Sequence, residues 1–206
     1  AQPRLAPDSG LPSIDPLTGL VTGPVFERLV REEIAVESIA YTGRLYVAYI
    51  RLDRFHHVNR WLGFSAGDRV LRECAARLTA IGAASEGREM PVAGPVAGRM
   101  GGDEFAYMAR LRPEESPWAR SQSILQELRR PFHAGSQSVQ ITASVGFLVV
   151  GGGDADAREI LRAGSDAAAK SRRCGGNSAQ EAVPLLAAEV DIRYELIHDL
   201  RQAVSG

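Results

Sequence analysis

The feature that most constrains the fold is a pair of adjacent glycines between two strand-like segments. Residues 91–100 read PVAGPVAGRM and residues 104–111 read EFAYMARL, with Gly101, Gly102 and Asp103 between them. Glycine adopts the positive φ angles that tight hairpin turns require. The sequence therefore predicts a β-hairpin at this point, and a hairpin introduces antiparallel pairing into the sheet that contains it.

The other segments alternate between helical and strand patterns around this hairpin. Strands are predicted over residues 44–53 and over residues 137–151, the latter as one strand or as two with the residues before it. Helices are predicted near residues 24–34, 54–63, 65–82, 113–132 and 156–176. The order helix, strand, helix, helix, hairpin, helix, strand, helix predicts an α/β (α+β) fold with a central, mostly antiparallel sheet flanked by helices.

The two ends of the chain differ in character from this middle part. Residues 1–13 are rich in Pro, Gly, Ser and Asp and are interpreted as a linker. Residues 181–206 carry apolar positions typical of one long amphipathic helix, which either packs back on the domain or leads into a further one. The predicted organisation is therefore a linker over 1–13, a domain over 14–180 and a C-terminal linker helix over 181–206.

Composition excludes several classes of protein. A net charge of −1 over 206 residues does not mark a nucleic-acid binder, and no nucleic-acid partner is expected. No apolar run reaches the length of a membrane-spanning helix. Cys74 and Cys174 lie far apart without a CxxC motif, so they are expected to be free thiols in a reducing compartment. We expect a cytoplasmic domain, with any membrane anchor in an N-terminal region outside this sequence.

Five segments together resemble one known family. They are DPLTGL (15–20), RLDRFHHVN with GFSAGD (51–68), RMGGDEF (99–105), ITASVGF (141–147) and SDAAAKSRRCGGN (165–177). Their order and spacing are similar to those of GGDEF domains, the diguanylate cyclases and their degenerate relatives, over roughly residues 14 to 177. The tail DIRYELIHDLRQAVSG resembles the linker helix before an EAL phosphodiesterase domain in tandem GGDEF–EAL proteins.

The resemblance implies a palm-like nucleotide-cyclase fold and a specific reaction. Family members join two GTP molecules into cyclic di-GMP, with two domains facing each other as a homodimer and Mg²⁺ neutralising the phosphates. Asp103 stands where the family carries its metal-binding, proton-accepting acid, and Glu104 is its second hairpin acid. Gly101 and Gly102 would let a nucleotide approach the backbone closely. The alternative for this segment is a solvent-exposed turn without catalytic function.

Two residues match the guanine contacts of the family. Asn59 can both donate and accept hydrogen bonds, and Asp68 can accept them from the N–H groups of guanine. The alternatives are that Asn59 is a cap or turn residue and that Asp68 supplies negative charge near a helix N-terminus. Guanine recognition by this pair is the preferred interpretation.

The sequence departs from the family at the position that matters most for metal binding. The acid expected on the first strand is Arg51, although the supporting Asp53 remains. A guanidinium cannot ligate Mg²⁺ and is permanently charged. Arg51 could stand in for the metal and hold a triphosphate, pair with Asp103 or Glu104 and close the site, or point outward on a shifted strand.

Further departures weaken the match elsewhere in the site. The phosphate-binding lysine of the last helix is Arg172, and other family residues are replaced by His56, Arg60, Phe64, Ala169 and Gly176. The RxxD motif for product inhibition is absent, because the matching residues are Val92, Ala93, Gly94 and Pro95. Feedback inhibition by cyclic di-GMP at that position is therefore not expected.

The sequence therefore favours a degenerate GGDEF domain with weak or no catalysis. It is predicted to bind GTP or to act as a regulatory module beside an EAL domain. Two alternatives stay open: an active diguanylate cyclase, and a dimerisation scaffold that binds no nucleotide. Mg²⁺ is expected for an active member of the family, whereas this chain could work without any metal ion.

Overall fold

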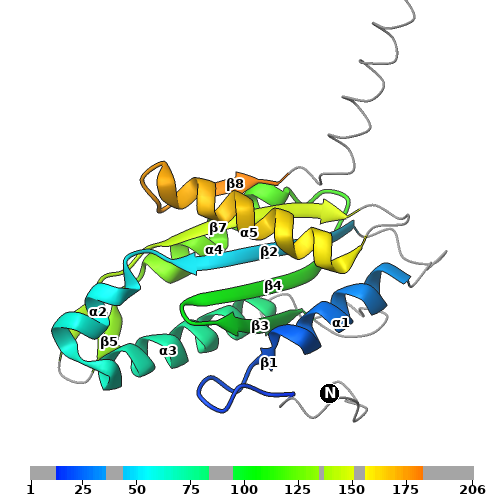
Figure 1. Ribbon diagram of the computed structural model, residues 1–206. Helices are drawn as coiled ribbons and strands as arrows, with labels where there is room; N and C mark the ends of the chain where they lie inside the picture. The colour runs from blue at the N-terminus through cyan, green and yellow to red at the C-terminus, as the bar shows by residue number, and fades with distance from the viewer. Residues whose placement is uncertain (1–12, 36–43, 84–94, 135–136, 151–155, 183–206) are drawn as a thin grey trace, which may run out of the picture.

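The computed structural model describes residues 13–35, 44–83, 95–134, 137–150 and 156–182, and it shows a six-stranded sheet between helices (Figure 1). The strands are β1 (Val21–Thr22), β2 (Arg44–Leu52), β3 (Val96–Gly101), β4 (Glu104–Leu111), β7 (Ala143–Val150) and β8 (Ala179–Glu181). The helices are α1 (Gly23–Ala35), α2 (Phe55–Leu62), α3 (Phe64–Ala83), α4 (Pro117–Arg129) and α5 (Ala157–Arg173). The predicted fold class is confirmed.

The sheet is antiparallel at its centre and parallel at its two edges. Its order is β1-β3-β4-β2-β7-β8, and β2 lies between β4 and β7 with antiparallel pairing on both sides. The predicted hairpin joins β3 and β4. Only the short outer strands β1 and β8 pair in parallel with their neighbours. The expectation of a mostly antiparallel sheet is therefore confirmed.

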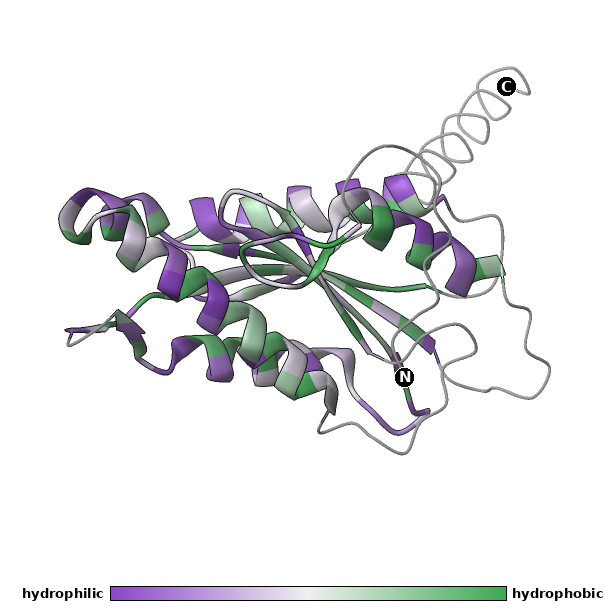
Figure 2. Cartoon of the chain, turned by 90° about the horizontal axis from the view of Figure 1, so that it is seen from below, coloured by the Kyte–Doolittle hydropathy of each residue, from purple (hydrophilic) through white to green (hydrophobic). Residues whose placement is uncertain are grey.

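Alternating residues of β2 point into two separate hydrophobic cores. Val47 packs with apolar residues of α1 and α5 on one face of the sheet, whereas Tyr46 and Ile50 pack with α3 and α4 on the other. Successive side chains of a strand point to opposite faces, so a strand covered on both sides must be apolar nearly throughout. Figure 2 shows this hydrophobic colouring along the strands, with mixed colouring on the surrounding helices.

The structure departs from the predicted elements in three places. The helix predicted through residue 132 ends at Arg129, and β5 (Phe132–Ala134) and β6 (Gln137–Val139) then form a separate two-stranded sheet. The segment 137–151 is thus split, because β6 pairs with β5 and β7 belongs to the main sheet. The edge strands β1 and β8 were not predicted, since strands of two and three residues carry no detectable alternation.

Some predictions cannot be compared with the structure. The linker over residues 1–12, most of the predicted C-terminal helix from residue 183 onward, and the start of the first hairpin strand at residues 91–94 lie outside the described residues. Within the described part of the chain, none of the helices has both the length and the apolar character needed to cross a membrane.

One end of the sheet gathers the segments that the sequence analysis singled out. The backbone N–H of Leu52, at the end of β2, donates to the carbonyl oxygen of Asp103 in the hairpin at 3.1 Å. The N–H of Asp53 donates to the carbonyl of Thr142, just before β7, at 2.7 Å. The hairpin tip, the end of β2 and the start of β7 are therefore fixed together, and Figure 1 shows the tip directed toward α2.

Candidate functional site

The hairpin turn has the backbone conformation that the glycine pair predicts. Gly101 has φ of 129° and Gly102 has φ of 50°, both in the region that L-residues rarely adopt. A Cβ atom at either position would meet no atom within 4 Å, so the glycines are required by backbone angle and not by close packing. The guanidinium of Arg99 donates to the carbonyl oxygen of Gly102, and this hydrogen bond connects the end of β3 to the turn.

Arg51 forms an ion pair with the second acid of the hairpin. Arg51 and Glu104 are direct partners in the antiparallel register of β2 and β4, and Arg51 Nη2 lies 2.7 Å from Glu104 Oε1. Both side chains are about three-quarters buried, at 25% and 24% exposure. The interpretation that Arg51 points outward on a shifted strand is therefore wrong. Of the two acids proposed as its partner, Arg51 pairs with Glu104.

The other carboxylate oxygen of Glu104 is also occupied. The hydroxyl of Tyr49 donates to Glu104 Oε2 at 2.5 Å, from a position two residues before Arg51 on the same face of β2. Burial raises the pKa of Tyr49 well above its usual value, and the neighbouring carboxylate raises it further. Tyr49 therefore stays protonated and acts as a donor. The result is a Tyr49–Glu104–Arg51 triad that satisfies both oxygens of the carboxylate.

The first acid of the hairpin faces the last helix. Asp103 Oδ2 lies 3.8 Å from Arg172 Nη1, which belongs to the final turn of α5. This is an ion pair beyond hydrogen-bonding distance, and its side chains are also partly buried, at 26% exposure for Asp103 and 33% for Arg172. Each acid of the turn is thus matched by one guanidinium, Asp103 by Arg172 and Glu104 by Arg51.

Asp53 has a structural role in holding the end of α5. Its buried carboxylate accepts from Thr142 Oγ1 at 2.7 Å, from Ser144 Oγ at 2.7 Å and from the backbone N–H of Asn177 at 2.8 Å. A Cβ atom at Gly176 would lie 2.7 Å from Asp53 Oδ2, and Gly176 has φ of 74°. Asp53 therefore fixes the turn that follows Arg172, and Gly176 makes room for it.

The predicted base-contacting residues lie at the junction of α2 and α3. A Cβ atom at Gly67 would lie only 1.9 Å from Asn59 Oδ1, so the carboxamide of Asn59 rests against Gly67, the residue before half-buried Asp68. Asn59 is inside α2, whose N-cap residue is Arg54, and Asp68 lies beyond the first turn of α3. The cap and helix-terminus alternatives are therefore wrong, while guanine contact by this pair stays a prediction.

Among the replaced family residues, those on α2 and at the start of α3 are exposed. The side chains of His56, Arg60 and Phe64 face solvent, with Phe64 at 78% exposure. The ring of His57 stacks on that of Trp61 with 4.7 Å between centroids. These residues form an aromatic and basic surface next to the Asn59 and Asp68 region.

The donors that remain do not fit the family's Mg²⁺ site. Mg²⁺ requires nearly octahedral oxygen ligands, usually carboxylates and substrate phosphates. Here the position of one acid is held by Arg51, and both oxygens of Glu104 are engaged within the protein. No group of three or more His, Cys, Asp or Glu side chains within the described ranges is arranged to hold a metal ion.

Four residues that shape the site were not predicted from the sequence. Tyr49 could have been found from its spacing, because residues two apart on a strand share a face. Thr142 and Ser144 bind Asp53 across 89 and 91 residues of sequence, and no local pattern indicates such pairs. Gly67 leaves room for the side chain of Asn59 on another helix, and this contact cannot be recognised from the sequence.

Comparison with known proteins supports the family resemblance. The family model described as "Diguanylate cyclase, GGDEF domain" matches residues 13–178. The cyclic di-GMP phosphodiesterase NbdA of Pseudomonas aeruginosa is 27% identical over 92% of this chain, and the diguanylate cyclase DgcP of the same organism is 31% identical over 78%. The chain spans only 23% and 22% of the length of these two relatives.

Solved structures agree with this match. The diguanylate cyclase SiaD of P. aeruginosa, solved with its activator SiaC, is 26% identical with a TM-score of 0.67, covering 82% of this chain and 61% of that one. The GGDEF domain of TpbB (YfiN) from P. aeruginosa has a TM-score of 0.71 at 24% identity, covering 86% and 99%, a likeness in fold. With a family model spanning most of its length, this chain belongs to the GGDEF family.

Proposed function

We propose that this chain is a regulatory GGDEF domain of cyclic di-GMP signalling that binds GTP and has impaired catalysis. The observation that carries the proposal is the ion pair of Arg51 with Glu104, at 2.7 Å. In the family resemblance, position 51 holds a metal-binding acid, and here it holds a cation that occupies the neighbouring acid. The relatives NbdA and DgcP are named for the hydrolysis and the synthesis of cyclic di-GMP, which supports this signalling context.

The argument against efficient catalysis is electrostatic. Joining two GTP molecules requires that the phosphate charge be neutralised and that a 3′-hydroxyl lose its proton to a nearby base. Both carboxylate oxygens of Glu104 already contact protein donors, and Asp103 lies 3.8 Å from the positive charge of Arg172. We therefore expect slow or absent product formation.

The argument for nucleotide binding comes from the opposite side of the hairpin. Asn59 is held against Gly67, and Asp68 follows immediately on α3 with its side chain half-buried. An amide and a carboxylate together supply the acceptors and donors that the Watson–Crick edge of guanine requires. Exposed Phe64 lies one helical turn before Asp68 on the same face of α3, which adds apolar surface beside them.

A regulatory role next to an EAL domain forms part of the proposal. The chain covers about a quarter of relatives such as NbdA, so those proteins carry further segments. One solved structure with a TM-score of 0.60 and 26% identity is that of an EAL/GGDEF domain protein from M. capsulatus. A GTP-bound GGDEF domain can influence an attached domain by favouring one arrangement of the two. Homodimerisation is required only if catalysis takes place.

The decisive experiment is incubation of the purified chain, at high concentration, with GTP and Mg²⁺, followed by chromatography for cyclic di-GMP. An active diguanylate cyclase assayed in parallel is the control. Absence of product together with GTP binding by calorimetry is the expected result. Product at a rate comparable to the control would establish an active cyclase instead, and absence of both product and binding would favour a scaffold without nucleotide.

A further inference from the structure

We propose that this domain binds its nucleotide without a divalent cation, because the guanidinium of Arg51 supplies the charge that a metal ion supplies in the family. The inference rests on the proposed GTP binding and adds how the phosphates are neutralised. It also changes which solution conditions control the domain, since a metal-free site would respond to GTP and not to Mg²⁺.

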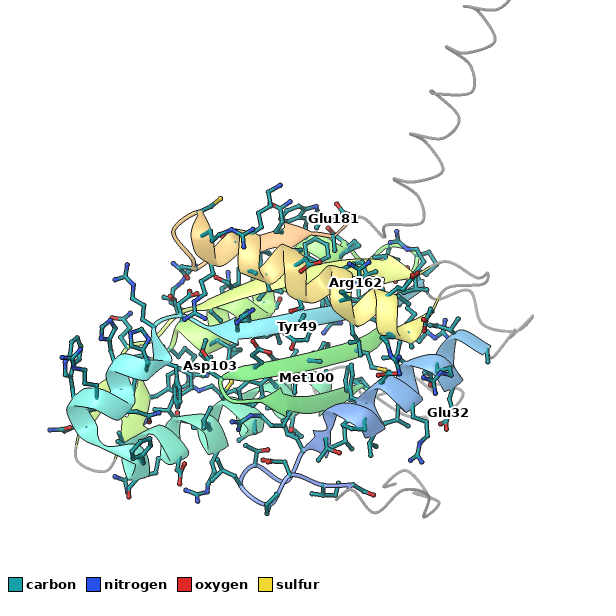
Figure 3. All side chains as sticks on the ribbon, viewed as in Figure 1. Glu32, Tyr49, Met100, Asp103, Arg162 and Glu181 are labelled. Carbon is teal, nitrogen blue, oxygen red and sulfur yellow. The ribbon has the colours of Figure 1, made fainter. Side chains whose placement is uncertain are left out.

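The position of Arg51 is fixed by the sheet and not by a mobile loop. Arg51 lies in register with Glu104 on one side and with Ser144 on the other, so its backbone is held by two strands. Tyr49 and Glu104 then orient the guanidinium from the same face of the sheet. In Figure 3, Tyr49 lies near the middle of β2 and Asp103 at the tip of the neighbouring hairpin.

The charge change at this position equals that of one Mg²⁺ ion. Replacing a carboxylate by a guanidinium raises the local charge from −1 to +1, a change of two elementary charges. A Mg²⁺ ion bound by the family's acid would contribute the same increase. The cation is therefore built into β2, and a triphosphate at the hairpin would share this guanidinium with Glu104 without first recruiting an ion.

An unsatisfied donor at the hairpin also favours an anion over a metal ion. Arg51 Nε is buried and has no hydrogen-bond partner among the described residues, and the same holds for Arg99 Nε and Nη1. The guanidinium of Arg99 lies over the ring of Phe105, and because Glu104 and Phe105 are successive residues of β4, Arg99 is on the opposite face of the sheet from Arg51. Only the Arg51 donor therefore belongs to this site. Buried N–H groups without acceptors are costly, and phosphate oxygens are acceptors for guanidinium groups. A metal ion would not satisfy the Arg51 donor.

Binding of Mg²⁺ would, in contrast, require existing contacts to break. Glu104 would have to loosen its contact with Arg51 at one oxygen, or with Tyr49 at the other, for that oxygen to ligate an ion as a free carboxylate does. Arg51 would then remain buried and positively charged beside the incoming dication. Asp103 alone would provide a single carboxylate, which already lies 3.8 Å from Arg172.

The test measures GTP affinity of the full chain by calorimetry, once in excess EDTA and once in excess Mg²⁺. We expect dissociation constants that agree within about threefold. Binding more than about tenfold weaker in EDTA would overturn this inference and leave the proposed GTP binding intact. Absence of binding in both buffers would overturn both. The two failures are therefore distinguishable.

Variants locate the effect at Arg51. Arg51→Asp restores the family's acid and should lose affinity in EDTA by about tenfold or more while gaining a dependence on Mg²⁺. Arg112→Asp makes the same charge change just beyond the opposite end of β4 and should bind like the parent. If Arg51→Asp fails to fold, Arg51→Gln removes the charge without placing two acids side by side. Unchanged metal-free affinity in a folded Arg51 variant would refute the role assigned to Arg51.

Discussion

The carboxylate of Asp53 offers the sharpest test of how the site is held together. It is buried at 8% exposure and accepts three hydrogen bonds, from Thr142, Ser144 and the backbone of Asn177. These bonds connect the end of β2 to the start of β7 and to the turn after α5. We therefore compare Asp53→Ala, which removes every acceptor, with Asp53→Asn, which keeps one oxygen.

The magnitude follows from the hydrogen bonds. Each bond to a charged group contributes about 1.5–3 kcal/mol, and bonds sharing one carboxylate are not additive. The two hydroxyl donors can rotate toward other acceptors, whereas the N–H of Asn177 cannot. We expect Asp53→Ala to lower the free energy of unfolding by about 3–5 kcal/mol. Asp53→Asn can keep the oxygen shared by Thr142 and Asn177, so its loss should be about 1–2 kcal/mol.

The assay is urea denaturation followed by circular dichroism and by tryptophan fluorescence. Trp118 packs edge-on against Phe147 of β7 with 4.9 Å between ring centroids, so its emission reports on the core. The dependence of the unfolding free energy on urea should stay constant while the midpoint falls. A loss below about 1 kcal/mol for Asp53→Ala, or equal losses for both variants, would refute the assigned role.

Three further predictions concern other parts of the chain. Glu33 is fully buried, and its carboxylate lies 3.1 Å from the guanidinium of Arg110. In urea denaturation, Glu33→Ala should lower the free energy of unfolding by about 3–5 kcal/mol and Glu33→Gln by less. Equal losses for the two variants would contradict an ionic role of Glu33. Gly67→Ala should displace the carboxamide of Asn59, because the added Cβ atom would lie 1.9 Å from its oxygen. The GTP affinity measured by calorimetry should fall by about tenfold, with little change in melting temperature. Unchanged affinity would show that Asn59 does not contact the base. Burial alone would raise the pKa of Glu73, but hydrogen bonds from neighbouring donors outweigh it and hold that pKa below its ordinary 4.5. Its stabilising contribution is therefore present above pH 4.5 and lost as the pH falls through the folded pKa, so the stability difference between the parent and Glu73→Gln should vanish in acid denaturation.

Much of the fold could be predicted because its signals are local. The glycine pair requires positive φ, and the structure has it at both residues. The apolar run 44–53 predicted a buried strand, and β2 is a central strand of the sheet with antiparallel neighbours on both sides. Strands β1 and β8 could not be predicted, since each exists only through pairing with β3 or β7. The end of α4 was placed too late because β5 follows it almost directly.

The sequence by itself determined which chemical groups are present at the candidate site. It showed that Arg51 replaces an acid and that Asp103, Glu104, Asn59 and Asp68 remain. The match of these residues to positions of the family motifs depends only on their order and spacing along the chain.

Only the tertiary structure decided which of these groups neutralise one another. Arg51 could have paired with either hairpin acid, and the register of β2 against β4 placed it on Glu104. Asp53 turned inward to bind residues about ninety positions away, while Arg172 came to Asp103 from the last helix. Ion pairs and hydrogen bonds act over a few ångströms, so their partners depend on strand register and helix packing and not on distance along the sequence.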